Sequence, residues 1–217
     1  CCAISIHLNA QSSFGKLFRS KAPFPINAIS HATYLQTIDS ALLVIYNVND
    51  TAPGTNLYLQ KLTYSGDVVW EKYIDLPNQM ETLQDAVQMP DSSINILCTY
   101  DIGNLIYDEE VYFVKINLAG ELITTNYITN TGICCWNIAD GRLKLNLKNQ
   151  LLYTHQSYGI SFSDGVVYLS DTNYNFINGG LDNNSLYHAT AFQDNDSNYF
   201  SFGYEPFKLP RTASLVK

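Results

Sequence analysis

The chain has 217 residues, of which 46% are hydrophobic and 15% are charged, so it has enough apolar side chains for a buried core. Its 12 basic and 20 acidic residues give a formal net charge of −8, and the few Lys and Arg are scattered along the sequence. We therefore expect no nucleic-acid partner and no attachment to an anionic membrane surface, because both need clustered positive charge. No apolar run reaches the roughly 20 residues that a membrane-spanning helix needs.

The chain begins with Cys1 and Cys2, followed by the strand-like stretch AISIHLNAQSSFGKLF from residue 3. A first residue other than Met indicates that the sequence has been cut or excerpted. One interpretation is a bacterial lipoprotein, anchored through a lipid on Cys1. The other is a segment of a larger protein.

A sequence repeat dominates the rest of the chain. The stretch LYLQKLTYSGDVVWEKYI at 57–74 recurs at 111–128 as VYFVKINLAGELITTNYI. Weaker copies begin at residue 3 and near residue 166, and ASLVK at 213–217 matches the start of another. The unit therefore recurs after about 54 residues, a period typical of β-propeller blades.

Each unit is predicted to contain four short strands. In the second unit these are LYLQKLT, VVWEKYI, LQDAVQM and INILCTY. Gly66 and Gly120 stand where a tight hairpin needs positive φ, and Asp-Ser pairs at 39–40, 91–92 and 196–197 predict a second set of turns. Four strands in about 50 residues make one blade. We therefore expect an all-β propeller with blades at 3–50, 57–102, 111–159 and 166–204, with 213–217 as the start of a further blade or a closing strand.

The pattern K-[LI]-x-x-x-G-x-[LVI], followed by an aromatic such as Trp70, a Tyr-Ile strand and an Asp-small-small hairpin, resembles repeats of bacterial extracellular β-propellers. Such repeats occur in surface and secreted proteins of the Bacteroidetes type, loosely similar to quinoprotein-like and kelch-like blades. The resemblance covers nearly the whole chain and implies a location outside the cell or on a bacterial surface. Only the second unit has the Trp, which we expect to pack between sheets.

The number of blades in the complete ring stays open at this point. Four blades can close a ring, with the last strand sealing it. Alternatively, these units belong to a larger propeller or to a surface complex.

His31 and His188 occupy equivalent positions in the first and fourth units, so a closed ring would bring them towards one axis. They are the candidate metal ligands, although the favoured explanation is common ancestry of a strand-end residue that both copies retain. The five Cys have no Cys-x-x-Cys spacing, and we expect no metal or cofactor from them. The acids at 108–110 and the DNDSN stretch at 194–198 are explained as a solvated loop and a turn.

GICCWN at 132–137 lies on a predicted connection between strands. Its Trp136 and Asn137 are candidates for ligand binding, and a strained disulfide between Cys134 and Cys135 is conceivable.

The expected function is a non-catalytic extracellular binding or scaffold module that engages a protein or a glycan through propeller loops. The alternative is a propeller-type hydrolase or lyase with its active site at the central channel. A binding module should expose aromatic side chains on one rim, whereas an enzyme should bring several acids or histidines together at the axis.

Overall fold

The computed structural model describes residues 28–49, 55–75, 81–101, 109–127, 138–158, 163–182, 187–193, 199–204 and 213–216. Within these residues the fold is all-β, as predicted, with three four-stranded sheets and one three-stranded sheet. The first sheet contains β1 (Ala28–Gln36), β2 (Leu42–Asn49), β3 (Thr55–Leu62) and β4 (Val68–Ile74). The second contains β5 (Glu81–Gln88), β6 (Ile94–Asp101), β7 (Glu109–Ile116) and β8 (Leu122–Tyr127). The third contains β9 (Ile138–Leu145), β10 (Leu151–Tyr158), β11 (Ser163–Ser170) and β12 (Phe176–Asp182). The fourth contains β13 (Tyr187–Gln193), β14 (Tyr199–Tyr204) and β15 (Ala213–Val216).

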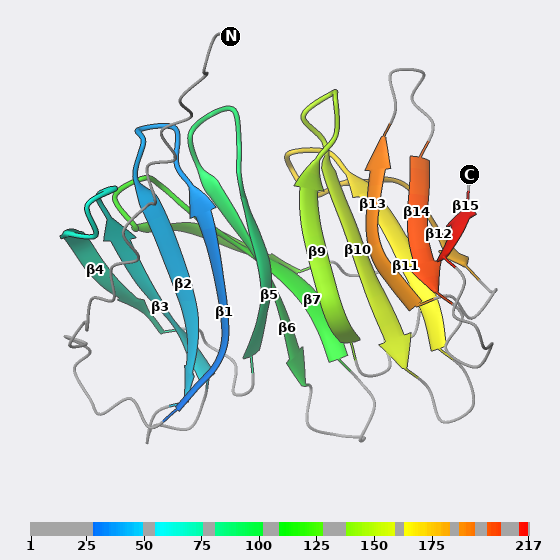
Figure 1. Cartoon of the computed structure of the whole chain (residues 1–217), viewed down its shortest axis with the longest axis horizontal. Helices are drawn as coiled ribbons and strands as arrows, with labels where there is room; N and C mark the ends of the chain where they lie inside the picture. The colour runs from blue at the N-terminus through cyan, green and yellow to red at the C-terminus, as the bar shows by residue number, and fades with distance from the viewer. Residues whose placement is uncertain are drawn as a thin grey trace, which may run out of the picture.

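The sheets stand side by side in chain order (Figure 1). Each is an antiparallel meander in which consecutive strands are hydrogen-bonded neighbours. The first strands β1, β5 and β9 lie next to one another, and β13 packs against the third sheet. No substantial contact joins the fourth sheet to the first among the described strands, so these strands form an open row.

The hydrogen bonds group the strands differently from the predicted blades. The sequence placed 57–74 at the start of a unit, but β3 and β4 complete a sheet that β1 and β2 begin. ASLVK likewise starts no new sheet, because β15 pairs with β14 as the third strand of the fourth sheet, with Val216 opposite Ser201. The echoes at 57, 111, 166 and 213 are all third strands. The stretch from residue 3 lies outside the described residues.

The described hairpins share one turn geometry. Each turn has five residues, for example 37–41. The N–H of its first residue donates to the carbonyl of its fifth, and the N–H of its fourth donates to the carbonyl of its first, at 2.8–3.1 Å. This is a type I turn followed by a residue in the left-handed region. The left-handed residue is Ser40, Ser92 or Asn149 between first and second strands, and Gly66, Gly120 or Tyr174 between third and fourth strands. The predicted positive φ of Gly66 and Gly120 is therefore confirmed, at 80° and 76°.

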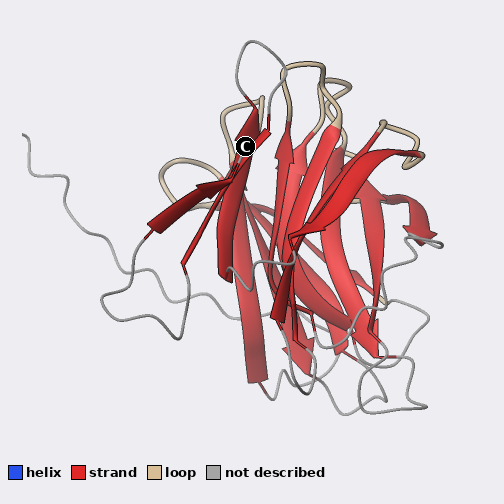
Figure 2. Ribbon diagram, turned by 90° about the vertical axis from the view of Figure 1, so that its right-hand side faces the viewer, coloured by secondary structure: helices blue, strands red, loops and turns tan. Residues whose placement is uncertain are grey.

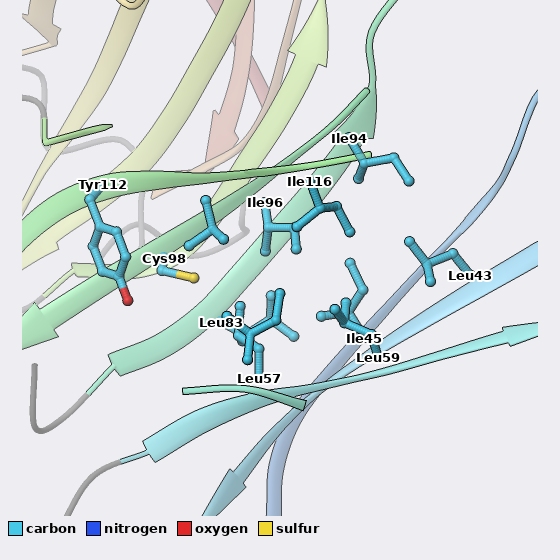
Figure 3. Packing of buried hydrophobic residues seen from close by; sticks show 12 residues of the cluster. Leu43, Ile45, Leu57, Leu59, Leu83, Ile94, Ile96, Cys98, Tyr112 and Ile116 are labelled. Carbon is cyan, nitrogen blue, oxygen red and sulfur yellow. The ribbon is translucent and has the colours of Figure 1, made fainter. Parts of the chain in front are cut away.

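The core lies between the sheets, as two apolar clusters. Leu43, Ile45, Leu57 and Leu59 of the first sheet point toward Leu83, Ile94, Ile96 and Ile116 of the second (Figure 3). A second cluster joins Leu97 and Phe113 of the second sheet to Leu143, Leu151 and Tyr153 of the third. Because a sheet contributes apolar side chains to both of its faces, each sheet depends on its neighbours for burial.

Candidate functional site

The adjacent strands β1, β5 and β9 are joined by hydrogen bonds from polar side chains. Asp85 Oδ1 accepts hydrogen bonds from Thr33 Oγ1 of the first sheet, at 3.3 Å, and from Ala86 N, at 2.8 Å. Its Oδ2 accepts from Leu143 N of the third sheet, at 3.0 Å. The neighbouring Gln84 accepts from Gly141 N through its Oε1, at 2.9 Å. Both carboxylate oxygens of Asp85 are therefore used to join three successive sheets.

The predicted histidine pair falls in the first and last sheets of the row. His31 is exposed on β1, opposite Asn47 of β2. His188 lies in β13, opposite Gly203 of β14. These strands make no substantial contact with each other within the described part of the chain, and no group of three metal-ligating side chains is found there. The histidine site therefore stays a prediction.

The other predicted site residues lie outside the described residues. This holds for Trp136 and Asn137, for the Cys134–Cys135 pair, for Cys1 and for the 194–198 stretch. Of the cysteines, Cys98 is described, and it is buried in the first apolar cluster. Trp70 lies between sheets, as expected: it packs against the same cluster.

The sequence did not predict one surface, which lies at the end of the sheets where the hairpin turns are. The tan loops in Figure 2 gather toward that end. Eight of the nine exposed large hydrophobic residues in the described part of the chain lie in a turn or within two residues after one. We call them the hairpin rim: Ile38, Tyr64, Val68, Val69, Leu122, Ile123, Leu147 and Ile177.

Three members of the hairpin rim repeat at one structural position. Val69, Ile123 and Ile177 are each the second residue of a fourth strand. Each is the extra residue of a β-bulge, because the ladder to the third strand skips it. Their exposed fractions are 54%, 52% and 45%. Bulges re-aim side chains at sheet edges, so the same device turns a β-branched aliphatic side chain to solvent in three sheets.

The carboxylates beside the rim are engaged in local hydrogen bonds. The hydrogen bond from Lys61, helped by one from Thr37, lowers the pKa of Asp39. Hydrogen bonds from Ser93 have the same effect on the pKa of Asp91. The side chain of Asn175 lowers the pKa of Asp171 in the third sheet. At neutral pH the rim is therefore an apolar surface bordered by ionised carboxylates.

The repeat itself carried the signal for this surface. Val68-Val69, Leu122-Ile123 and Phe176-Ile177 stand at the same place in three successive copies of the unit. A prediction that took these pairs as strand interior would bury them. The bulge, which no sequence pattern announces, is what leaves the second residue of each pair half-exposed.

Two solved structures from Bacteroides resemble the chain. An endo-arabinase from Bacteroides thetaiotaomicron aligns with 92% of this chain and 78% of its own, at 10% sequence identity and a TM-score of 0.58. A protein of unknown function from Bacteroides caccae aligns with 85% of this chain at 14% identity, with a TM-score of 0.46, and this chain spans only 58% of its length. The likeness to the endo-arabinase shows a shared β-sheet fold and nothing further.

No protein-family model and no curated protein matches the sequence. Among the described residues there is no helix long and apolar enough to cross a membrane.

Proposed function

We propose that the chain is a non-catalytic binding module of the β-propeller type that engages a protein partner through the hairpin rim. The hairpin rim itself is the observation that carries this proposal. Eight large hydrophobic side chains gather at one end of the described sheets, and three of them repeat at the same bulge. Exposed apolar patches of this kind mark interaction sites on soluble proteins.

The chemistry of the rim favours a protein over a glycan. Seven of its eight members are aliphatic, and Tyr64 alone is aromatic. Sugars are bound by flat aromatic faces combined with hydrogen-bonding groups, whereas aliphatic side chains gain by excluding water against another apolar surface. A partner surface that is apolar with basic side chains would also complement the ionised carboxylates beside the rim.

The propeller architecture is supported by the side-by-side sheets and by the alignment with the endo-arabinase. We favour binding over the hydrolase alternative because both carboxylate oxygens of Asp85 accept hydrogen bonds from neighbouring sheets. A catalytic acid needs an oxygen within reach of a substrate. A location outside the cell remains part of the proposal, on the resemblance of the repeats alone.

A triple substitution of the bulge residues tests the proposal. The variant Val69→Lys, Ile123→Lys, Ile177→Lys adds charge to the rim at exposed sites, so we expect it to fold normally. Its matched control is Ser65→Lys, Ala119→Lys, Asn173→Lys, which adds the same charge at exposed positions of the same three hairpins. The immobilised full chain and both variants are incubated with the protein extract of the encoding organism and, separately, with a polysaccharide panel.

The expected result is a protein that the full chain and the control retain and the rim variant loses. Retention by all three proteins would show that the rim does not bind it. Binding of a polysaccharide by the full chain, or release of reducing sugar from one, would contradict the proposed function.

A further inference from the structure

Two buried polar side chains in the second and third sheets lack part of their hydrogen bonding. Asn95 of β6 is 0% exposed, and its Nδ2 has no hydrogen-bond partner among the described residues. Ser170, the last residue of β11, is 1% exposed, and its Oγ likewise has no partner in the described part of the chain. We call Asn95 and Ser170 the buried polar pair. Leaving a buried amide or hydroxyl group without a partner is costly, so both groups indicate a ligand.

Both members of the buried polar pair face the interface between the second and third sheets. Alternation along β6 places Asn95 on the same face as Leu97, and alternation along β11 places Ser170 on the same face as Tyr168. Leu97 and Tyr168 belong to the apolar cluster that joins these two sheets. The hydroxyl of Tyr174, in the hairpin after β11, donates to Asn95 Oδ1 at 2.5 Å. The Nδ2 of Asn95 is therefore the end of its amide that still needs a partner.

The first interface shows which side chains meet at the same place. By strand register, Leu43 of the first sheet corresponds to Asn95, and Ile116 of the second sheet corresponds to Ser170. Leu43 and Ile116 belong to one cluster, in which side chains of the first sheet point toward those of the second (Figure 3). We therefore expect Asn95 and Ser170 to face one another across the second interface.

The buried polar pair also changes the size of the side chains at this point. Asn95 and Ser170 replace two branched aliphatic side chains of the first interface by shorter polar ones. Tyr174 fills part of the space that this exchange leaves, with its ring stacked on Phe113. A polar lining and a little room are what a buried water molecule needs.

We propose that a water molecule binds between the second and third sheets and bridges the buried polar pair. Its oxygen accepts a hydrogen bond from Asn95 Nδ2, and one of its hydrogens is donated to Ser170 Oγ. The water therefore provides a polar link between the sheets where the first interface has apolar packing.

The surrounding charges favour a neutral ligand over an ion. A side-chain amide nitrogen only donates hydrogen bonds, so Asn95 Nδ2 does not suit a cation. Lys115 lies 3.2 Å from Asp91, and these two charges offset each other. Burial, followed by the negative charge of Asp91, raises the pKa of Tyr174, so an anion beside this hydroxyl would meet the same unfavourable charge. Water meets none of these penalties.

A high-resolution crystal structure of the full chain tests the site directly. We expect density for a water within hydrogen-bond distance of both Asn95 Nδ2 and Ser170 Oγ. A direct hydrogen bond between these two side chains would overturn the proposal, as would apolar atoms alone around Asn95 Nδ2. Anomalous scattering from a halide at this place would also overturn it.

Oxygen-17 relaxation dispersion of the full chain provides a measurement in solution, because it detects long-lived bound waters and is insensitive to exchanging hydroxyl protons. A chain of 217 residues is expected to bury about eight waters. The variant Asn95→Leu, Ser170→Ile introduces the residue types of the first interface, so we expect it to fold and to lose about one eighth of the signal.

The matched control is Asn173→Leu, Ser65→Ile, which makes the same exchanges at exposed turn positions and should keep the full signal. Circular dichroism melting checks that both variants are folded. An equal signal from the full chain and from the Asn95→Leu, Ser170→Ile variant would contradict the proposal. If that variant does not fold, the crystal structure of the full chain still decides.

The water site is independent of the proposed partner at the hairpin rim. The triple rim variant should keep the water, and the Asn95→Leu, Ser170→Ile variant should keep the captured protein. Failure of one proposal therefore leaves the other measurable.

Discussion

The interface between the first and second sheets and the interface between the second and third sheets place their large side chain on opposite partners. Between the first and second sheets, the large residue is Trp70 of β4, which lies over Gly120 in the hairpin of the second sheet. At the corresponding positions between the second and third sheets stand Thr124 of β8 and Tyr174 in the hairpin of the third sheet. The large side chain therefore comes from the preceding sheet in one interface and from the following sheet in the other.

Either of the two neighbouring sheets can therefore supply the large side chain that fills this part of the interface. Tyr174 stacks on Phe113 of the second sheet, with ring centroids 5.0 Å apart, and its hydroxyl donates to Asn95 Oδ1 at 2.5 Å. It does so from a left-handed conformation with φ of 66°, which costs a non-glycine residue on the order of 1 kcal/mol. Burial, with the nearby charge of Asp91, raises the pKa of Tyr174 to about 12, so the phenol stays a hydrogen-bond donor.

The largest effect is expected from adding one methyl group at Gly120. A Cβ there would lie 2.7 Å from Trp70 Cη2 and 2.9 Å from Lys72 Cγ, and φ is +76°. Overpacking of this kind costs about 1–3 kcal/mol, and the left-handed backbone adds about 1 kcal/mol. We expect Gly120→Ala to lower the free energy of unfolding by about 3 kcal/mol in urea denaturation.

A double-mutant cycle separates the two causes. Trp70→Ala removes the ring that a Cβ at position 120 would strike. In that background the Lys72 side chain can move into the space left by the ring, so Gly120→Ala should cost little more than the backbone part, about 1 kcal/mol. An equal cost in both backgrounds would mean that Trp70 does not pack against Gly120 in solution.

The second prediction concerns Tyr174. At this position we expect a glycine variant to be more stable than an alanine variant, the reverse of the usual order. Tyr174→Ala loses the stacking on Phe113 and the bond to Asn95 and keeps the strained backbone, at a cost of about 2 kcal/mol. Tyr174→Gly loses the same contacts but relieves the strain, so it should cost about 1 kcal/mol less. Paired urea denaturation of the two variants measures the difference, and an alanine variant as stable as the glycine variant would contradict it.

The third prediction transplants one interface onto the other. Thr124→Trp alone should strike Tyr174, and Tyr174→Gly alone should leave a gap. Combined, they reproduce the Trp and Gly arrangement of the first interface. We expect the double variant to exceed the sum of the two single variants by about 1 kcal/mol in unfolding free energy. Additive effects would show that the two interfaces are not interchangeable.

The sequence predicted the strands and turns of this fold but not where one sheet ends and the next begins. Gly66, Gly120 and the Asp-Ser pairs identify tight hairpins, because their backbone conformations restrict the residue type. Other connections are longer or lack these residues, such as 50–54 within the first sheet and 75–80 between the first and second. Their similar lengths gave no means of telling a link within a sheet from a link between sheets. Inter-strand hydrogen bonds, which are non-local, decide the grouping.

The contacts between the sheets were harder to predict for a related reason. Trp70 was correctly assigned to a space between sheets, since a large flat side chain on an alternating strand suits that place. Its counterpart Gly120, which lies in the next copy of the repeat, has a second local explanation as a turn residue, so nothing in the sequence linked the two. Tyr174 gave no signal either, because an aromatic residue rarely takes a left-handed conformation.

The smallest predicted effect concerns the lysines that further distinguish the two interfaces. Lys61 Nζ is 2.6 Å from Asp39 Oδ2 and donates to the carbonyl of Leu118 in the second sheet, at 3.3 Å, so it ties two sheets together. The corresponding Lys115 lies 3.2 Å from Asp91 of its own sheet and is more exposed. In the third sheet the corresponding residue is Leu169, which shows that the position accepts an apolar side chain.

Acid sensitivity should therefore be stronger at Lys61 than at Lys115. Because the pKa of Asp39 is lowered in the folded state, its ion pair stabilises the fold above the ordinary value of 3.8, and this stabilisation is lost as the pH falls through the lower folded value. Asp39 has a side-chain exposure of 47%, so solvent limits the contribution to less than about 1 kcal/mol. We expect Lys61→Leu to reduce the loss of stability between pH 6 and pH 2.5, measured by urea denaturation, and Lys115→Leu to reduce it less. Equal pH profiles for the full chain and Lys61→Leu would mean that the ion pair between Lys61 and Asp39 does not form in solution.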